Sequence, residues 1–154
     1  MIHIGCDPGL AGALAALTPE GLVLRVMPTV RQGKRQVLDE REIVNWFMQF
    51  PVSQTHVLIE LVTARPGQGV VSMFSFGTGW GLLRGICAGM GLPYELVRPQ
   101  EWQGEMLKGQ PKGSEYSVAS RFWPNADWRI SPKRIHSGLV DAALIAEFGR
   151  RRSS

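Results

Sequence analysis

Three acidic residues lie inside segments that otherwise consist of core-forming residues. Glu60 occurs in the apolar run VLIELV, Asp7 ends the apolar start MIHIGCD, and Asp141 interrupts the run LVDAALIA. A buried, ionised carboxylate without a partner is very costly, so each acid must be neutral, paired with a cation or bound to a metal. The three acids predict one carboxylate cluster around divalent metal. The alternative is three unrelated acids, each neutralised by a local arginine such as Arg65.

A carboxylate cluster of this kind has a defined chemistry. Closely spaced carboxylates cannot all ionise unless a cation lies between them. Oxygen-rich sites favour Mg²⁺ or Mn²⁺. Two such ions about 4 Å apart can activate a water molecule and stabilise the leaving oxygen in an in-line phosphodiester displacement. We therefore expect two Mg²⁺ or Mn²⁺ ions and a phosphodiester substrate.

The net positive charge of the chain comes from its C-terminal part. Residues 1–120 contain 10 basic and 10 acidic residues, whereas residues 121–154 contain 7 basic and 3 acidic residues. A basic segment attracts a polyanion, and this one surrounds Asp141, which favours nucleic acid as the partner. The alternative is a solvated tail with scattered surface charge.

Length and composition indicate one folded domain without a membrane segment. A chain of 154 residues can bury a real core. It contains no window of 18 uncharged apolar residues and no basic signal-peptide start. Cys6 and Cys87 lie in apolar segments without metal-type spacing, so we expect reduced core thiols in a cytoplasmic protein.

The elements that position the acids follow an α/β order. Apolar or alternating runs between turn residues predict strands, and helical periodicity with capping residues predicts helices. The expected strands are 1–7, 11–18, 21–27, 56–62 and 93–98. A helix capped by Asp39 is expected before Pro51, and further helices are expected at 71–91, 100–107, 115–122 and 138–149.

The last of these helices directs its acid toward the core. At about 100° per residue, Asp141 shares one face with Leu144, Ile145 and Phe148. The acid therefore points toward the surface on which its apolar neighbours pack. Ser137 is in phase with Asp141, and its alternative role is that of the N-cap of the helix.

Glycines recur every four residues along the long helix at 71–91. They line one stripe of that helix, and each costs about 1 kcal/mol of helix stability relative to alanine. They are therefore expected to permit close backbone approach, either to the sheet or to a second subunit. The glycines are Gly77, Gly81, Gly85 and Gly89.

Several motifs resemble those of the RuvC-type Holliday-junction resolvases. The strand ending Cys6–Gly9, the strand Leu58–Glu60 and the helical segment Asp141–Leu144 carry the likeness. The segments Pro66–Gly77 and Val97–Trp102 are similar to the phage and organellar branch of that family. The resemblance extends over nearly the whole chain.

The resemblance implies an α/β, RNase H-like fold with a mixed five-stranded sheet flanked by helices. The nuclease domain would span 1–150, followed by a basic C-terminal tail at 151–154. It further implies a homodimer that resolves four-way DNA junctions with paired, symmetric nicks that depend on Mg²⁺ or Mn²⁺. Asp7, Glu60 and Asp141 match three of the family's metal-binding carboxylates.

The fourth metal-binding position departs from the family pattern. The phage and organellar branch usually carries an acid where this chain has Ser137, and other branches carry an acid or histidine where it has Gly138. His136 is the nearest substitute ligand, and neutral imidazole suits Mn²⁺ better than Mg²⁺. His136 and Ser137 are both retained as ligand candidates for the second metal.

Additional residues are candidates for contact with DNA. Phe74, Phe76 and Trp80 follow the Glu60 strand, where the family places an aromatic that stacks at the junction centre; we expect two of the three to be core. Basic candidates lie in polar segments, and the alternative for each is plain solvation. They are Lys108, Lys112, Lys133, Arg134, Arg31, Lys34 and Arg35, the last three in a polar loop.

Two other functions remain open at this point. The first is a branched-DNA-binding relative that cuts weakly or not at all because Ser137 replaces a metal-binding acid. The second is an actin-like or sugar-kinase-type phosphate site, because Asp7–Gly9 also resembles the first phosphate loop of those proteins. The chain is too short for their two-lobed architecture, which favours the nuclease.

Overall fold

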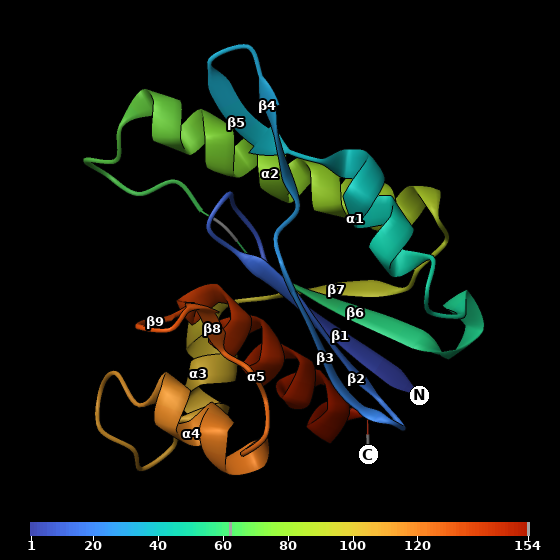
Figure 1. The fold of residues 1–154 in the computed structure, drawn as a ribbon, viewed down its shortest axis with the longest axis vertical. Coiled ribbons are helices and arrows are strands. Elements are labelled where there is room, and N and C mark those ends of the chain that lie inside the picture. Colours follow the sequence, from blue (N-terminus) through green and yellow to red (C-terminus); the bar gives the residue numbers. More distant parts are fainter. Residues whose placement is uncertain (62, 154) are drawn as a thin grey trace.

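The protein is built around a five-stranded mixed sheet (Figure 1). The computed structural model describes residues 1–61 and 63–153. The strand order is β3-β2-β1-β6-β7; β1, β2 and β3 form an antiparallel meander, and β6 and β7 run parallel to β1. The strands are β1 (Ile2–Asp7), β2 (Ala13–Thr18), β3 (Gly21–Val26), β6 (Thr55–Glu60) and β7 (Tyr94–Val97). This arrangement confirms the predicted fold class.

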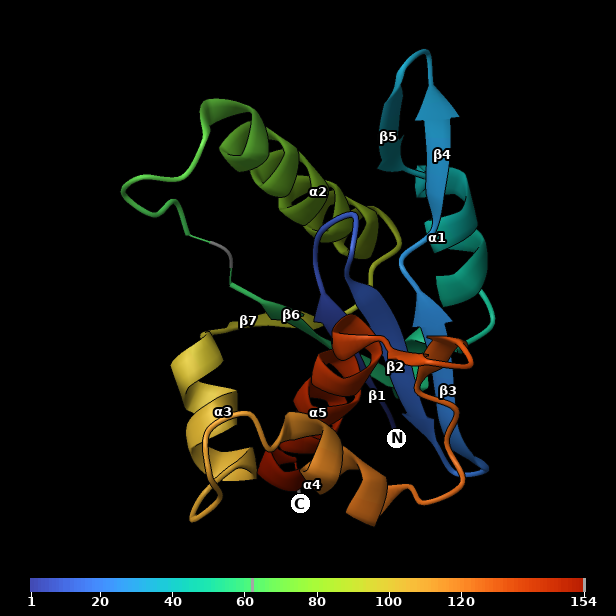
Figure 2. The same ribbon diagram turned by 60° about the vertical axis from the view of Figure 1, so that its left-hand side comes forward.

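Helices cover both faces of the sheet and bury a core on each side (Figures 1 and 2). One face packs against α1 (Glu40–Phe47) and α2 (Val70–Gly89), with the short 3-10 helix η1 (Val52–Gln54) leading into β6. The opposite face packs against α3 (Pro99–Met106), α4 (Glu115–Phe122) and α5 (Ser137–Arg152).

Helix α5 lies directly on the sheet because glycines leave room for it. A Cβ on Gly5 of β1 would collide with the carbonyl oxygen of Ala142, and a Cβ on Gly149 would stand 2.5 Å from a methyl group of Leu58. A Cβ on Gly138, the second residue of α5, would stand 3.0 Å from Oδ2 of Asp7. The N-terminal end of α5, which carries Asp141, is therefore at the end of the sheet where β1 finishes.

The segment expected as a polar loop is instead an antiparallel hairpin. Strands β4 (Thr29–Gln32) and β5 (Arg35–Leu38) pair through a two-residue turn, and Gly33 takes a φ of +64° there. A glycine with positive φ at the first central position suits a tight hairpin turn. Arg31 and Arg35 are therefore strand residues, and the prediction of a loop was wrong because alternation over four residues is too short a signal.

A second small hairpin was not predicted at all. Strands β8 (Arg129–Ser131) and β9 (Arg134–Ile135) pair immediately before α5. Helix α5 also runs three residues further than expected, through Arg152, so the first two residues of the predicted 151–154 tail are helical. The other elements lie within two residues of their predicted bounds. The strand expected at 56–62 ends at a residue, 62, that lies outside the described residues.

The expectation that both cysteines are core thiols holds. Cys6 and Cys87 are buried free thiols. In the described residues, 1–61 and 63–153, no helix has the length and apolar character that crossing a membrane would require.

Candidate metal centre

Asp7 and Glu60 end two neighbouring parallel strands. Because Cys6 pairs with Ile59 across β1 and β6, the next residues, Asp7 and Glu60, stand side by side at the same edge of the sheet. Side chains alternate along a strand, so both acids face the side on which α5 packs. Asp141, in the second turn of α5, completes the group.

Burial and the neighbouring acids raise the pKa values of Asp7 and Asp141. Burial raises the pKa of Asp7 to about 8, with further contributions from Glu60 and Asp141. Burial likewise raises the pKa of Asp141 to about 7, helped by Glu60 and by Glu115, the first residue of α4. No sequence motif pointed to Glu115. Three acids from distant segments therefore share one partly buried environment that disfavours their ionised forms.

Glu60 is held in place by a tryptophan. The indole Nε1 of Trp102 in α3 donates a hydrogen bond of 2.8 Å to Oε1 of Glu60, and Trp102 is fully buried. Burial raises the pKa of Glu60, while this hydrogen bond and the charge of Arg65 oppose the rise. Sequence reasoning assigned no role to Trp102. The available signal was that a buried indole N–H needs an acceptor.

His136 is the N-cap of α5, so the prediction that Ser137 takes that place was wrong. Nδ1 of His136 accepts a hydrogen bond of 3.2 Å from the backbone N–H of Leu139. Burial lowers the pKa of His136, which favours the neutral ring. With Nδ1 as acceptor, the proton of the neutral ring is on Nε2. Ligation of a metal through Nε2 would therefore require the other tautomer and release of the cap.

The imidazole of His136 lies beside Asp7, and Gly138 makes this possible. A Cβ on Gly138 would stand 2.9 Å from Cε1 of His136 and 3.0 Å from Oδ2 of Asp7. The ring thus occupies space next to the point from which a side chain at 138 would project. This placement gives a physical reason for the glycine: a larger residue would displace either the histidine or the carboxylate.

The donor set suits an oxygen-preferring cation, but its geometry is not a closed cage. Carboxylates from β1, β6 and α5 are the ligands that Mg²⁺ and Mn²⁺ prefer. Over residues 1–61 and 63–153, no three His, Cys, Asp or Glu side chains are arranged to hold an ion as they stand.

An open cleft of about 620 Å³ extends from Glu60. Two cations line it, Arg65 after β6 and Arg98 at the start of α3, together with the ring of Phe76. Sequence reasoning treated Arg65 only as a neutraliser of acids and did not single out Arg98. The cleft places positive charge beside a carboxylate, which suits a phosphate group held next to the acids.

The aromatic residues at the start of α2 are more exposed than expected. Phe74 is 74% exposed and Phe76 is 39% exposed, whereas Trp80 packs against the core. The expectation that two of the three are core was wrong, because the first turns of α2 extend beyond the sheet (Figure 2). Phe76 lies over Gly9, where a Cβ would stand 3.2 Å from its ring, so it borders the loop that follows Asp7.

The predicted basic contacts are exposed but dispersed. Lys108 and Lys112 lie in the loop between α3 and α4, and Lys133 and Arg134 lie in the β8–β9 hairpin that leads into α5. None of the ion pairs among the described residues involves these four cations. Their contact with DNA stays a prediction.

Comparison with known proteins identifies the fold. No family model and no curated protein matches the sequence. The chain is similar to the solved structure of Thermus thermophilus RuvC, with 18% identity, a TM-score of 0.62 and coverage of 99% of this chain and 97% of the other. It is also similar to T. thermophilus RuvC in complex with Holliday junction substrate, with 16% identity, a TM-score of 0.61 and coverage of 99% and 96%. The likeness shows the fold, a mixed five-stranded sheet flanked by helices as in RuvC.

Proposed function

We propose that this protein is a metal-dependent endodeoxyribonuclease that resolves four-way DNA junctions by paired nicks. The observation that carries the proposal is the meeting of Asp7, Glu60 and Asp141 at one edge of a RuvC-like sheet. Support for the substrate comes from a solved structure of similar fold that holds a Holliday junction. The lining of the adjacent cleft by Arg65 and Arg98 suits a phosphate backbone.

Each acid has a distinct role in this proposal. Asp7, the most buried of the three, would be the ligand common to two Mg²⁺ or Mn²⁺ ions, and Glu60 and Asp141 would each hold one of them. When bound, such ions would supply an activated water and neutralise charge on the leaving oxygen. Trp102 restricts the rotation of Glu60 through its hydrogen bond. His136, or Ser137 through water, completes the second metal site.

We assign the protein to the phage and organellar branch of the RuvC-type resolvases. Two segments that carry this likeness meet in the fold: Trp102 belongs to one of them and Phe76 to the other, and each borders Glu60 or its cleft. The resemblance of the segments therefore concerns residues around the site rather than residues scattered over the surface.

Paired nicks require two active sites, and α2 offers a surface for a second copy of the chain. Ideal Cβ atoms on Gly77, Gly81, Gly85 and Gly89 would meet no atom within 4 Å, so the stripe does not pack on the sheet. This open stripe supports the explanation by a second subunit over packing on the sheet. Close approach of two such helices would form a homodimer.

The direct test is cleavage of a synthetic four-way junction in Mg²⁺ or Mn²⁺. We expect paired nicks with 5′-phosphate and 3′-hydroxyl ends, and we expect Asp7→Asn to abolish them while junction binding persists. Natively folded wild-type protein that makes no paired nicks in either metal would refute the proposal. Loss of junction binding in Asp7→Asn would instead assign Asp7 a structural role.

The dimer is tested by filling the glycine stripe. Alanine favours a helix over glycine by about 1 kcal/mol, so Gly81→Ala with Gly85→Ala should stabilise an isolated chain yet weaken a dimer that needs close approach. Gly104 in α3 also faces open space, and Gly104→Ala is the matched control. Light scattering should report a lower dimer fraction for the double variant alone; an unchanged fraction would contradict the α2 interface.

One observation favours retaining the binding relative as a second candidate. The acids do not form a closed ligand set among the described residues, and Ser137 is an exposed neutral residue where the branch carries an acid. A protein of this kind would bind the junction with normal affinity and cut it slowly. The Ser137→Asp variant described below separates the two candidates.

A further inference from the structure

The β4–β5 hairpin leaves the sheet at the same end as the candidate metal centre. Ala13 is paired with Asp7 on one side and with Val26 on the other, so β3 finishes level with Asp7. The next residue, Met27, donates its N–H to the carbonyl of Gly12, in the turn that follows Asp7 (3.0 Å). The hairpin therefore starts beside the loop of the first catalytic strand and extends outward from there (Figures 1 and 2).

The hairpin is anchored at its base alone. Leu38 is buried, and its side chain lies against α2, where a Cβ on Gly79 would stand 3.0 Å from it. The N–H of Asp39 donates to the carbonyl of Pro28 and closes the base (2.9 Å). Beyond this point the residues from Val30 to Gln36 are all exposed. An isolated two-stranded ribbon has marginal stability in water. A bound partner would therefore stabilise the exposed half of the hairpin.

The exposed half of the hairpin carries positive charge only. Arg31, Lys34 and Arg35 project from it, and no acid occurs between Glu20 and Asp39 in the sequence. The ion pairs within residues 1–61 and 63–153 include none of these three cations. Three uncompensated cations on one arm match a polyanion.

We propose that the β4–β5 hairpin is a DNA-binding arm that grips a duplex branch of the substrate next to the cut site. The proposal rests on the nuclease function proposed above. A two-stranded ribbon has the width that the major groove of B-form DNA admits. Each strand of four residues spans about 13 Å, so the tip reaches past the sheet edge to phosphates outside the cleft.

The first experiment measures junction affinity against salt for the wild type and for Arg31→Gln/Lys34→Gln/Arg35→Gln. Each phosphate contact contributes about 0.9 to the slope of log K against log salt concentration, so the triple variant should lower the slope by about 2 to 3. Its junction affinity at fixed salt should fall together with the slope, because the three cations contact phosphates in this proposal.

Two controls separate charge from folding. The variant Arg31→Lys/Arg35→Lys keeps the charge and should keep the salt slope. If the triple variant has a lowered thermal midpoint, the turn variant Lys34→Glu, which leaves the strands intact, replaces it. A charge reversal at the tip should weaken binding and lower the slope by at least about 1.

The outcomes distinguish this inference from the proposed function. If the wild type cuts junctions while neither the triple variant nor Lys34→Glu changes the affinity or the salt slope, the DNA-arm inference is overturned and the nuclease stands. The same holds if the arm captures a protein instead and DNA binding is unchanged. If the wild type neither binds nor cuts junctions, the proposed function fails first, and the arm assignment fails with it.

Discussion

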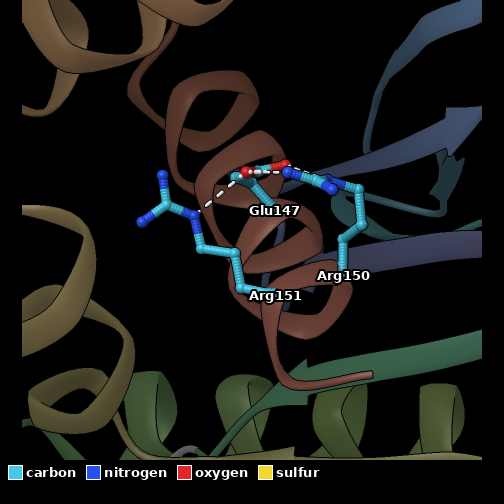
Figure 3. Close-up of polar contacts among 3 residues, drawn as sticks. All are labelled: Glu147, Arg150 and Arg151. Atoms are coloured by element: carbon cyan, nitrogen blue, oxygen red, sulfur yellow. Dashed lines mark hydrogen bonds and ion pairs between the residues drawn. The ribbon is translucent and has the colours of Figure 1, made fainter. Parts of the chain in front are cut away.

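Two acids of helix α5 point toward the protein interior, but one has acidic neighbours and the other has basic neighbours. Asp141, near its N-terminal end, has its pKa raised to about 7 by burial and by the neighbouring charges of Glu60 and Glu115. Glu147 is only 4% exposed, and burial alone would raise its pKa as well. Hydrogen bonds from Arg150 and Arg151 outweigh that effect and hold the pKa of Glu147 below its usual value (Figure 3).

The difference separates an acid that is paired within its own helix from one that is not. Both oxygens of Glu147 accept bonds of 2.7 Å from Arg150, and Arg151 adds a bond of 3.0 Å, so its charge is compensated within the helix. Asp141 stands among other acids, which raise its pKa together with burial. A buried carboxylate of this kind would gain more from an added cation than Glu147 would, which supports the metal-binding role proposed for Asp141.

The pairing of Glu147 also bears on the expected substrate contact. The basic C-terminal segment was predicted to attract a polyanion, and within it Arg150 and Arg151 pair with Glu147, while Arg152 lies 3.6 Å from Glu95. Nine residues of helix place Arg150 about 14 Å from Asp141. The contact of this run with DNA stays a prediction, at a distance from the acids.

The largest expected effect is a difference in cleavage rate between variants of the two acids of α5. Asp141→Asn should reduce single-turnover junction cleavage by more than about a hundredfold, because even residues that only support a metal ligand commonly contribute ten- to a hundredfold. Glu147→Gln should cut at the wild-type rate. Equal losses of cleavage rate in the two variants would contradict separate roles for Asp141 and Glu147.

The same pair should have opposite effects on stability. Glu147→Gln should lower the free energy of unfolding by about 2 kcal/mol, because it removes charged hydrogen bonds from a buried group. Asp141→Asn should raise it at pH 8 in metal-free protein, because it removes a carboxylate that the fold disfavours in its ionised form. Urea unfolding at fixed pH measures both; a stabilised Glu147→Gln variant would contradict the pairing.

The pH dependence follows from the raised pKa values. Asp7 and Asp141 have folded-state pKa values of about 8 and about 7, above their ordinary value of 3.8, so the folded protein binds more protons than the unfolded chain between these limits. Stability of the metal-free protein should therefore fall as the pH rises from about 4 and should level off above the folded-state pKa values of about 7 and about 8. Asp7→Asn should flatten this fall, and added Mg²⁺ or Mn²⁺ should oppose it in the wild type alone.

A smaller effect is expected at the tryptophan that holds Glu60. Trp102→Phe keeps an aromatic ring but removes the indole donor to Oε1. Residues that orient a metal ligand contribute about ten- to a hundredfold, so cleavage should fall by about tenfold while junction affinity is retained. Gln103, on the same helix but only partly buried, provides the control Gln103→Ala. Cleavage at the wild-type rate by Trp102→Phe would show that the indole hydrogen bond to Glu60 is not needed for catalysis.

The smallest effect concerns the missing fourth acid. Ser137 is exposed, so Ser137→Asp adds a carboxylate without steric cost and should raise cleavage by up to about tenfold at unchanged junction affinity. Gly138→Asp is the matched control, because its side chain would meet His136 and Asp7. A gain far above tenfold would favour the binding relative as the natural function; no gain would leave His136 as the better candidate for the second site.

Local pattern was sufficient for much of this fold. Unbroken apolar runs marked the strands that end at Asp7 and Glu60, and helical phase correctly placed Asp141 beside Leu144, Ile145 and Phe148, all of them buried. The short hairpins were missed because strands of two to four residues carry almost no periodicity. The partners Trp102 and Glu115 were missed because they join the site through contacts between helices and strands far apart in sequence.

The sequence by itself determined that three acids lie in buried segments and that one face of α5 must pack on a sheet, because burial pattern is a property of neighbouring residues. Only the tertiary structure decided which acid is paired and which is not. Arg150 and Arg151 can reach Glu147 because one helical turn separates them, whereas the partners of Asp141 come from β6 and α4. The packing of α5 on the sheet, with Gly138 against Asp7, decides which end of the helix meets the other acids.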